Sequence, residues 1–443
     1  MEQYEKYKDS GIEWIGEIPE HWDVKKIKHR CYVKGRVGWK GLKSSEFLTD
    51  GFSYLVTGTD FKNDTVDWDN CYHIDEERYN EDPYIQLQNE DLLITKDGTI
   101  GKLAVVTNLD KPACLNSGIF VVRSTKDDFS TRFLLWVLKS SIFTDFNGLT
   151  AYGSTIQHLY QNVFVEFAFA FPPVNTQISI ADYLQKKTAE IDRIIANKQK
   201  LIALYEEEKQ AIINQAVTAS IQANVSYKKT STDWLDEIPD SWQFLTMKRL
   251  VSTKITDGPH ETPEFFPDGV PFLSAESVKN GKLDFDFRRG NISKVLDELY
   301  SKKCKPKRND IFIVKSGSTT GKIAIVDFDD DFNIWSPLAL VRVNEKVKPY
   351  FLYYALQSFY FQKQIQLSWS FGTQPNIGMN VIENLKVAVP ISLDEQDSII
   401  SHIESELKRL NEIIEKFNKQ IDLLQEYRTT LISEVVTGKI KVC

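Results

Sequence analysis

The chain has 443 residues, of which 42% are hydrophobic and 26% are charged, and its formal net charge at pH 7 is −8. This composition is typical of a soluble globular protein with two or three domains, and no run of 18 apolar residues indicates a transmembrane helix. The five cysteines are scattered without a Cys-x-x-Cys pair, which argues against a disulfide framework or a zinc site. The residues after Met1 lack the apolar core of a signal peptide, so we expect a soluble protein in the cytoplasm.

Two tryptophans spaced eight residues apart open each half of the chain. The first pair is Trp14 and Trp22, and the second pair is Trp234 and Trp242, which follows 220 residues later. An Ile-Pro dipeptide lies inside each pair and ends any local helix. We expect the tryptophans to pack the first segment of each lobe onto its core, although stacking on nucleic-acid bases is a second interpretation.

Short runs of β-branched and aromatic residues follow each tryptophan pair. They predict strands at residues 52–56, 91–95, 103–106 and 119–122 in the first half, and at 310–314, 323–326 and 339–342 in the second. Residues 133–138 and 350–361 are apolar at helical spacing and predict short amphipathic helices. Each lobe is therefore predicted to be α+β.

Charge is segregated along the chain. Residues 24–45 hold eight Lys or Arg and no acid, whereas residues 60–91 hold eleven acids, and five basic residues fall within 302–308. Such blocks can be ordinary solvated surface, but basic blocks in both halves of an acidic chain favour a phosphate-facing surface on each lobe. The DNA-contact candidates from these blocks are Lys34, Arg36, Lys40, Lys43, Lys303, Lys305 and Arg308.

A glycine-rich turn that ends in Gly-Lys lies between two predicted strands in each half. Residues 95–102 read TKDGTIGK and residues 314–322 read VKSGSTTGK. The spacing of the glycines and the apolar residue after each lysine argue against a nucleotide-binding loop. The turns can be plain hairpins whose glycines supply positive φ, hairpin tips that offer N–H groups, hydroxyls and lysines to DNA, or both. The candidates here are Lys96, Thr99, Lys102, Lys315, Ser318, Thr319 and Lys322.

A second pair of loops, at residues 151–155 and 370–374, joins an aromatic residue to glycine and small polar residues. Such loops can approach another surface closely, so Ser154 and Thr373 complete the DNA-contact candidates. Strand-like apolar runs at 163–171 and 381–390 come next, and each ends in a proline-containing turn. After these turns, a long helix is expected to begin at an N-cap, for which Asn175, Thr176 and Asp394 are the candidates.

Two long heptad stripes follow, and they have the same spacing. The first contains Leu184, Thr188, Ile191, Ile195, Lys198, Ile202, Tyr205, Lys209, Ile212 and Ala216, and the second contains Ile403, Leu407, Leu410, Ile414, Phe417, Ile421, Leu424, Leu431 and Val435, with Arg428 as a polar break. Subtracting 219 from the second set gives the first, so the chain is a duplicated lobe plus helix. We expect the two helices to bury each other's seam as an antiparallel coiled coil. The more polar first stripe leaves room for helices of a partner.

No catalytic centre can be identified in the sequence. The six histidines are not set at ligand or triad spacing, and no Gly-x-Gly loop opens a strand–helix unit. The acidic-Pro-Pro-aromatic motif of amino-methyltransferases is also missing, since Asp82-Pro83-Tyr84 lacks one proline and Phe171-Pro172-Pro173-Val174 differs at both ends. We therefore expect no enzyme activity, no cofactor and no metal.

The tandem order of Trp…Ile-Pro…Trp, α+β lobe, Pro…Gln and long helix resembles the specificity subunit of type I restriction–modification systems. The resemblance covers nearly the whole chain. It implies a target-recognition domain at 1–174, a spacer helix at 175–222, a second recognition domain at 223–392 and a second spacer helix at 393–443. It also implies double-stranded DNA with a split site as the ligand, and two modification methyltransferase subunits and restriction–translocase subunits as partners. No membrane is implied.

Two other functions remain open from the sequence alone. A coiled-coil scaffold with two protein-binding lobes would explain the heptads and the acidic net charge, but not the basic block in each lobe. A stand-alone nuclease would require a carboxylate cluster that the sequence does not reveal. Salt-dependent DNA binding separates the DNA reader from the scaffold, and magnesium-dependent DNA cleavage would favour the nuclease.

Overall fold

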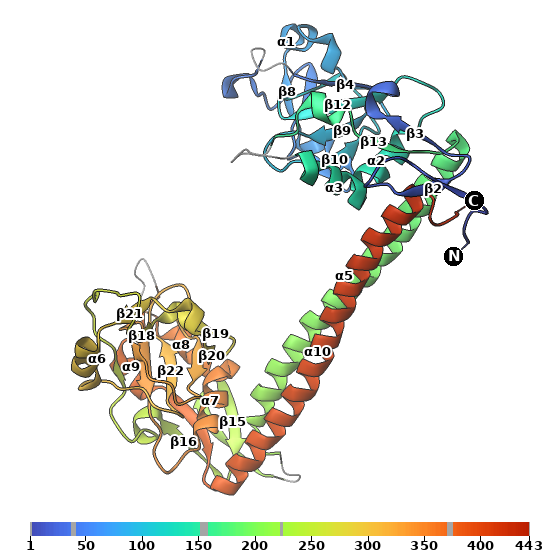
Figure 1. Cartoon of the computed structure of the whole chain (residues 1–443). Helices are drawn as coiled ribbons and strands as arrows, with labels where there is room; N and C mark the ends of the chain where they lie inside the picture. Colours follow the sequence, from blue (N-terminus) through green and yellow to red (C-terminus); the bar gives the residue numbers. More distant parts are fainter. Residues whose placement is uncertain (1, 37–40, 151–157, 222–224, 370–374, 443) are drawn as a thin grey trace. The chain divides into compact units, whose positions relative to one another are not determined.

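The computed structural model describes residues 2–36, 41–150, 158–221, 225–369 and 375–442 (Figure 1). The chain forms two compact units, one containing Met1–Lys198 with Asn418–Cys443 and the other containing Gln199–Phe417. Each unit holds one α+β lobe together with one end of a pair of long helices. Within the described residues, we find no helix with the length and apolarity that a membrane span requires.

The first lobe begins with a short hairpin and continues into a mixed β structure. Its strands are β1 (Tyr7–Asp9), β2 (Glu17–Pro19), β3 (Asp23–Lys26), β4 (Cys31–Gly35), β5 (Ser53–Val56), β6 (Phe61–Lys62), β7 (Thr65–Val66), β8 (Tyr72–Ile74), β9 (Leu92–Thr95), β10 (Leu103–Val105), β11 (Ala113–Leu115), β12 (Ile119–Ser124) and β13 (Ala168–Phe171). Its helices are α1 (Glu76–Asn80), α2 (Thr131–Lys139), α3 (Ser141–Thr150) and α4 (Gln161–Phe164).

A six-stranded sheet, in the order β4-β12-β9-β10-β7-β6, separates two apolar cores in this lobe. Successive residues of a strand point to opposite faces, so Leu92 and Ile94 join the core that contains α2, whereas Leu93 joins the core beneath the three-stranded sheet β11-β5-β8. Because both faces are covered, β9 is buried throughout its length, and its first three residues are all apolar. The strands predicted at 52–56, 91–95, 103–106 and 119–122 are confirmed as β5, β9, β10 and β12.

The second lobe repeats this plan. Its strands are β14 (Tyr227–Thr232), β15 (Leu235–Pro239), β16 (Trp242–Thr246), β17 (Thr256–Asp257), β18 (Val270–Leu273), β19 (Val278–Lys279), β20 (Lys282–Leu283), β21 (Gly290–Ile292), β22 (Ile311–Val314), β23 (Ile323–Ile325), β24 (Asn333–Ile334), β25 (Leu338–Val341) and β26 (Lys386–Pro390). Its helices are α6 (Lys294–Ser301), α7 (Pro349–Gln357), α8 (Phe359–Leu367) and α9 (Met379–Asn384). The central sheet has the order β17-β25-β22-β23, and β22 again alternates between two cores. The strands predicted at 310–314, 323–326 and 339–342 are confirmed as β22, β23 and β25.

The long helices are α5 (Val174–Ala216, 43 residues) and α10 (Leu393–Val436, 44 residues). In the first unit, the start of α5 packs on the end of α10, with Leu184 and Ile191 in the same core as Leu431. Asp192 lies 3.0 Å from Arg428, which explains how the second stripe accommodates its polar break. Figure 1 shows the two helices side by side.

In the second unit, the end of α5 packs on the start of α10. Ile213 shares a core with Ile399, and the rings of Tyr205 and Phe417 lie 6.1 Å apart between centroids. Early residues of one helix meet late residues of the other in both units, so the predicted antiparallel coiled coil is confirmed.

The predicted packing of the tryptophan pairs is also confirmed. Trp22 and Trp242 are fully buried, and each lies in the core beside the long helices. Trp242 also donates its indole N–H to Glu395 of α10 at 2.9 Å. In the first lobe, β3 follows Trp22 and pairs with the last strand, β13. In the second lobe, β16 contains Trp242 and pairs with the last strand, β26. The first and last segments of each lobe are thereby joined next to the long helices.

Three local predictions are wrong. The runs at 163–171 and 381–390 are not single strands, because each begins as a helical turn (α4 and α9) and only ends as a strand. The predicted helix at 350–361 breaks at Ser358, where the backbone is extended and the hydroxyl bonds to the Ala355 carbonyl. The helix caps lie earlier than expected, since α5 already contains Asn175 and Thr176 and α10 contains Asp394.

Candidate nucleic-acid interface

The glycine-rich turn of the first unit is the tip of the antiparallel hairpin β9–β10. Thr95 closes this tip, since its hydroxyl donates to the Thr99 carbonyl at 2.5 Å and accepts from the Lys102 N–H at 2.9 Å. Gly98 and Gly101 have φ values of 71° and 83°, as expected for a tight turn. The closed turn leaves Thr99 and Lys102 exposed. The tip is therefore a stiff protrusion that carries a hydroxyl and a cation.

The turn of the second unit is the tip of the hairpin β22–β23. Here Thr320 closes the tip by donating its hydroxyl to the Gly317 carbonyl at 2.7 Å. Gly317 and Gly321 again have positive φ, so the predicted hairpins are confirmed in both units. Ser318 and Lys322 are exposed and Thr319 is half-buried. The two tips thus present the same chemical groups on the same supersecondary element.

In both units, the described segment that follows the second predicted loop contacts the hairpin tip. Ser154 and Thr373 themselves fall outside the described residues, but the segments that follow their loops contact the tips. The Leu159 N–H donates to the Lys96 carbonyl at 3.0 Å, and the Ile377 N–H donates to the Lys315 carbonyl at 2.8 Å. Residues about 60 positions apart in sequence thus meet at one end of each lobe.

The basic block of the first unit is only partly available to a ligand. Lys34 and Lys43 are exposed, while Lys40 lies outside the described residues. Arg36 is only 2% exposed, and its Nε donates to the Leu115 carbonyl at 2.9 Å. The expectation that Arg36 contacts DNA needs correction, because its guanidinium lies inside the protein and supports the backbone of β11.

The basic block of the second unit is held by acids, contrary to the expectation of an open cationic surface. Lys305 lies 2.9 Å from Asp297 and 2.5 Å from Asp331. Arg308 lies 3.0 Å from Asp329. These pairs neutralise the outer part of the block, so the sequence overstated its positive charge.

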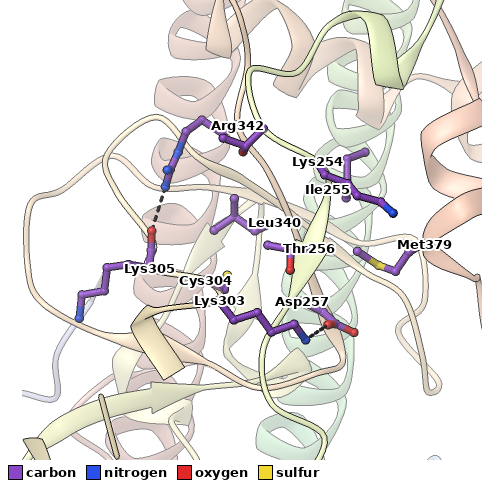
Figure 2. A pocket seen from close by; sticks show the side chains of 11 residues that line it. Lys254, Ile255, Thr256, Asp257, Lys303, Cys304, Lys305, Leu340, Arg342 and Met379 are labelled. Atoms are coloured by element: carbon purple, nitrogen blue, oxygen red, sulfur yellow. Dashed lines mark hydrogen bonds and ion pairs between the residues drawn. The ribbon is translucent and has the colours of Figure 1, made fainter. Parts of the chain in front are cut away.

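Lys303 and Lys315 share one carboxylate, that of Asp257 on β17. Their Nζ atoms lie 2.6 and 3.1 Å from its oxygens, and His260 Nε2 lies 3.1 Å away. Burial by itself would raise the pKa of Asp257, but the hydrogen bonds and charges of the two lysines outweigh it, and the pKa lies below its ordinary value. A cavity of about 470 Å³ opens here, and Figure 2 shows Lys303 and Asp257, two of the residues that line it, in contact with each other.

A buried Asp–Arg pair braces the central sheet of each lobe. Asp91 accepts two hydrogen bonds of 2.7 Å from Arg123, and Asp310 accepts bonds of 2.8 and 2.7 Å from Arg342. Each arginine also donates to a backbone carbonyl at 2.8 Å, that of Gln86 or that of Lys305. The second of these contacts is drawn in Figure 2. Asp91 and Asp310 are 219 residues apart, and so are Arg123 and Arg342. This repeat of the heptad offset is the sequence signal that could have revealed the two pairs.

A buried glutamine joins each lobe to its long helix. Gln177 in the first turn of α5 accepts from the Ser130 N–H at 2.9 Å, and it donates to the Pro172 and Asp128 carbonyls at 2.8 and 3.1 Å. Gln396 in α10 makes the same three bonds in the second lobe. The Pro…Gln pattern noted in the sequence is thus a lobe–helix clasp.

The structure describes every histidine, aspartate and glutamate of the chain and four of its five cysteines. Among them, no group of three or more His, Cys, Asp or Glu is placed to hold a metal ion. Cys31, Cys71, Cys114 and Cys304 are buried free thiols, and burial raises the pKa of each. Exposed hydroxyls and lysines on rigid tips are instead suited to polar and phosphate contacts.

Comparison with known proteins identifies the family. The model for the type I restriction modification DNA specificity domain matches residues 19–204 and 239–423. The chain is 23% identical over 438 residues to the type I restriction enzyme MjaVIII specificity subunit of Methanocaldococcus jannaschii, covering 96% of this chain and 94% of the relative. It is also 23% identical over 358 residues to the EcoBI specificity subunit of Escherichia coli, covering 79% and 74%.

Solved structures share the fold. One chain, from a structure of complex assembly and conformational transition of the type I R-M system, aligns with a TM-score of 0.71 at 13% identity over 96% of this chain and 99% of that one. The HsdS subunit from Thermoanaerobacter tengcongensis aligns with a TM-score of 0.54 at 12% identity, covering 96% and 98%. With two specificity domains that together span most of its length, the chain belongs to the family of type I restriction–modification specificity subunits, the non-catalytic subunits that recognise DNA.

Proposed function

We propose that the chain reads a bipartite site in double-stranded DNA, with one lobe for each half-site. The observation that carries this proposal is the duplication of the hairpin tip, which lies between the same two strands of each lobe and bonds to corresponding residues, Leu159 in one lobe and Ile377 in the other. The residues of the two tips differ, with Thr99 in one and Ser318 and Thr319 in the other. Two lobes of one fold with different tips would read two different sequences.

The contacts divide into two kinds. Lysines contact phosphates and provide salt-dependent affinity, and the hydroxyls and N–H groups of the tips approach base edges. The proposed phosphate contacts are Lys34, Lys40, Lys43, Lys96, Lys102, Lys303, Lys315 and Lys322. Ser154 and Thr373 remain proposed contacts of the adjoining loops. Lys305 and Arg308 must exchange an acidic partner for a phosphate before they contact DNA.

We further propose that two modification methyltransferase subunits dock on the helices. Each unit exposes an apolar patch beside the helix seam. The first apolar patch consists of Ile194, Leu423 and Tyr427, which are 42, 55 and 44% exposed. The second apolar patch consists of Leu201, Leu204 and the half-buried Ile413, with Leu201 and Leu204 41 and 50% exposed.

The two patches are related by the internal repeat. Ile194 and Ile413 are 219 residues apart, and so are Leu204 and Leu423. Each patch therefore combines one Ile and one Leu from different helices: Ile194 of α5 with Leu423 of α10, and Leu204 of α5 with Ile413 of α10. In an antiparallel pair, such residues lie on one flank of the seam. Large exposed apolar side chains mark protein-binding surfaces, and a repeated patch fits two copies of one partner. Restriction–translocase subunits would complete the assembly, because the relatives are named as subunits of type I restriction enzymes.

The test is methylome sequencing of a host that expresses the chain with its neighbouring methyltransferase gene, compared with the same host lacking the chain. We expect a split adenine-methylated motif that disappears when the chain is deleted. An unchanged methylome in the presence of an active methyltransferase would contradict the proposal and favour a scaffold role.

A further inference from the structure

The Asp257 carboxylate is placed to hold more positive charge than it can neutralise. Asp257 is 6% exposed, yet it contacts the ammonium groups of both Lys303 and Lys315. By contrast, the buried Asp91 and Asp310 each pair with one arginine among the described residues. The two lysines and one aspartate therefore leave a fixed excess of one positive charge at the base of the second hairpin tip.

The backbone around Asp257 is pinned in place. β17 pairs with β25 through Asp257 and Ala339, and Gly258 follows immediately. A Cβ atom at Gly258 would lie 1.9 Å from the Ile334 carbonyl oxygen, so only glycine allows this approach. Lys303 Nζ also donates to the Gly258 carbonyl at 3.1 Å. The backbone that carries the carboxylate is thus held in place, and the carboxylate together with the Gly258 carbonyl positions the Lys303 ammonium group.

The cluster remains open to a ligand. The Lys303 side chain is 49% exposed and that of His260 is 70% exposed, whereas that of Lys315 is 12% exposed. The adjoining cavity is also lined by Lys254, which is exposed (Figure 2). A phosphodiester at this position would meet Lys303 directly and Lys315 behind it. An oriented pair of cations costs less to order on binding than two free lysine chains.

We propose that Asp257 is a positioning residue that fixes Lys303 and Lys315 on one phosphate of the half-site read by the second lobe. This inference rests on the proposed DNA-reading function. A phosphate contact carries no sequence information itself, but it sets the register in which the hairpin tip meets the bases. Asp257 therefore contributes to discrimination although it is an acid and repels DNA.

The test uses the full chain with its methyltransferase and duplexes built on the motif found by methylome sequencing. Fluorescence anisotropy measures the dissociation constant for the intact site and for sites with one half scrambled. Discrimination is the ratio of the dissociation constant for a site with one half scrambled to that for the intact site. We expect Asp257→Asn to reduce this ratio by roughly tenfold at one half-site, which is the effect of one charge-assisted contact. Binding to the scrambled duplex should stay equal or strengthen, because a negative charge has been removed.

Asp236→Asn is the matched control. It removes the same charge from an acid whose side chain is 79% exposed and which pairs with Lys229 in the same lobe, outside the proposed DNA contacts, and discrimination should stay within about twofold. If Asp257→Asn leaves the ratio of the two dissociation constants unchanged, whether or not both sites bind more weakly, the inference is overturned. If no split motif exists, the proposed function fails instead, so the two failures are distinguishable.

Two further variants keep the inference testable should Asp257→Asn not fold. Lys303→Gln and Lys315→Gln should each reduce the magnitude of the slope of log binding constant against log salt concentration, and the double variant should reduce it by about one, the value for one lost phosphate contact. A slope that neither variant changes would contradict a phosphate at this cluster. Circular dichroism establishes that each variant is folded before it is titrated.

Discussion

Replacing Gln177 with alanine tests whether the buried glutamine holds the first lobe to its helix. The side chain is fully buried and makes three hydrogen bonds to backbone groups, of 2.9, 2.8 and 3.1 Å. A buried hydrogen bond contributes about 1 kcal/mol net, so we expect the free energy of unfolding of the first unit to fall by about 3 kcal/mol. With a urea dependence of about 2–3 kcal/mol per M, the midpoint should move by roughly 1–1.5 M.

The assay labels cysteines in urea and identifies each labelled residue by mass spectrometry. Cys31, Cys71 and Cys114 report on the first unit and Cys304 on the second, so the units are followed separately. Gln177→Ala should shift labelling of the first unit alone. Gln185→Ala, at an exposed position of the same helix, is the control and should leave the midpoint unchanged. A shift smaller than about 0.3 M for Gln177→Ala would refute the clasp.

Three further predictions follow from the thiols and the helices. Without urea, Cys31 and Cys304 should resist labelling by iodoacetamide at pH 8. Burial raises the pKa of both thiols to about 12 and so disfavours the reactive thiolate. Labelling within minutes would contradict this prediction and show that the lobes open readily. Ile194→Glu and Ile413→Glu each place a charge in one apolar patch, so each variant should bind one methyltransferase copy fewer. The double variant should bind none. Light scattering after size exclusion measures the mass of each complex. Ile178→Glu, at a position 47% exposed and outside both patches, should release none. One heptad inserted in both helices lengthens them by about 10 Å and should widen the spacer of the split motif by at most about three base pairs, whereas an unchanged spacer would exclude a ruler role.

Local patterns predicted much of the fold. The heptad stripes require only the order of apolar residues, and the duplication is visible because the two stripes are spaced alike. The hairpin tips could be predicted because glycines at turn positions and β-branched runs act over a few residues. The burial of Trp22 and Trp242 followed from the size of the indole and the repeated spacing.

The pairing of charges could not be predicted in the same way. Lys303 pairs with Asp257, which lies 46 residues earlier, and Arg36 donates to Leu115, which lies 79 residues later. Only the folded sheet brings these residues together, so a basic block in sequence gave no measure of exposed positive charge. The helix starts were misplaced for a related reason, because Gln177 and Gln396 bind lobe backbone that is distant in sequence.

The central claim is that each lobe reads one half-site and that the internal repeat relates the two readers. It is tested most directly by a hybrid chain in which residues 22–172 are replaced by a second copy of residues 242–390, from the buried tryptophan to the proline before the long helix. Because the helices are antiparallel and repeated, two identical lobes should read inverted copies of one half-site. Methylome sequencing of a host with this hybrid should therefore give a split motif whose halves are reverse complements. A motif with two different halves, or the motif of the natural chain, would contradict the account.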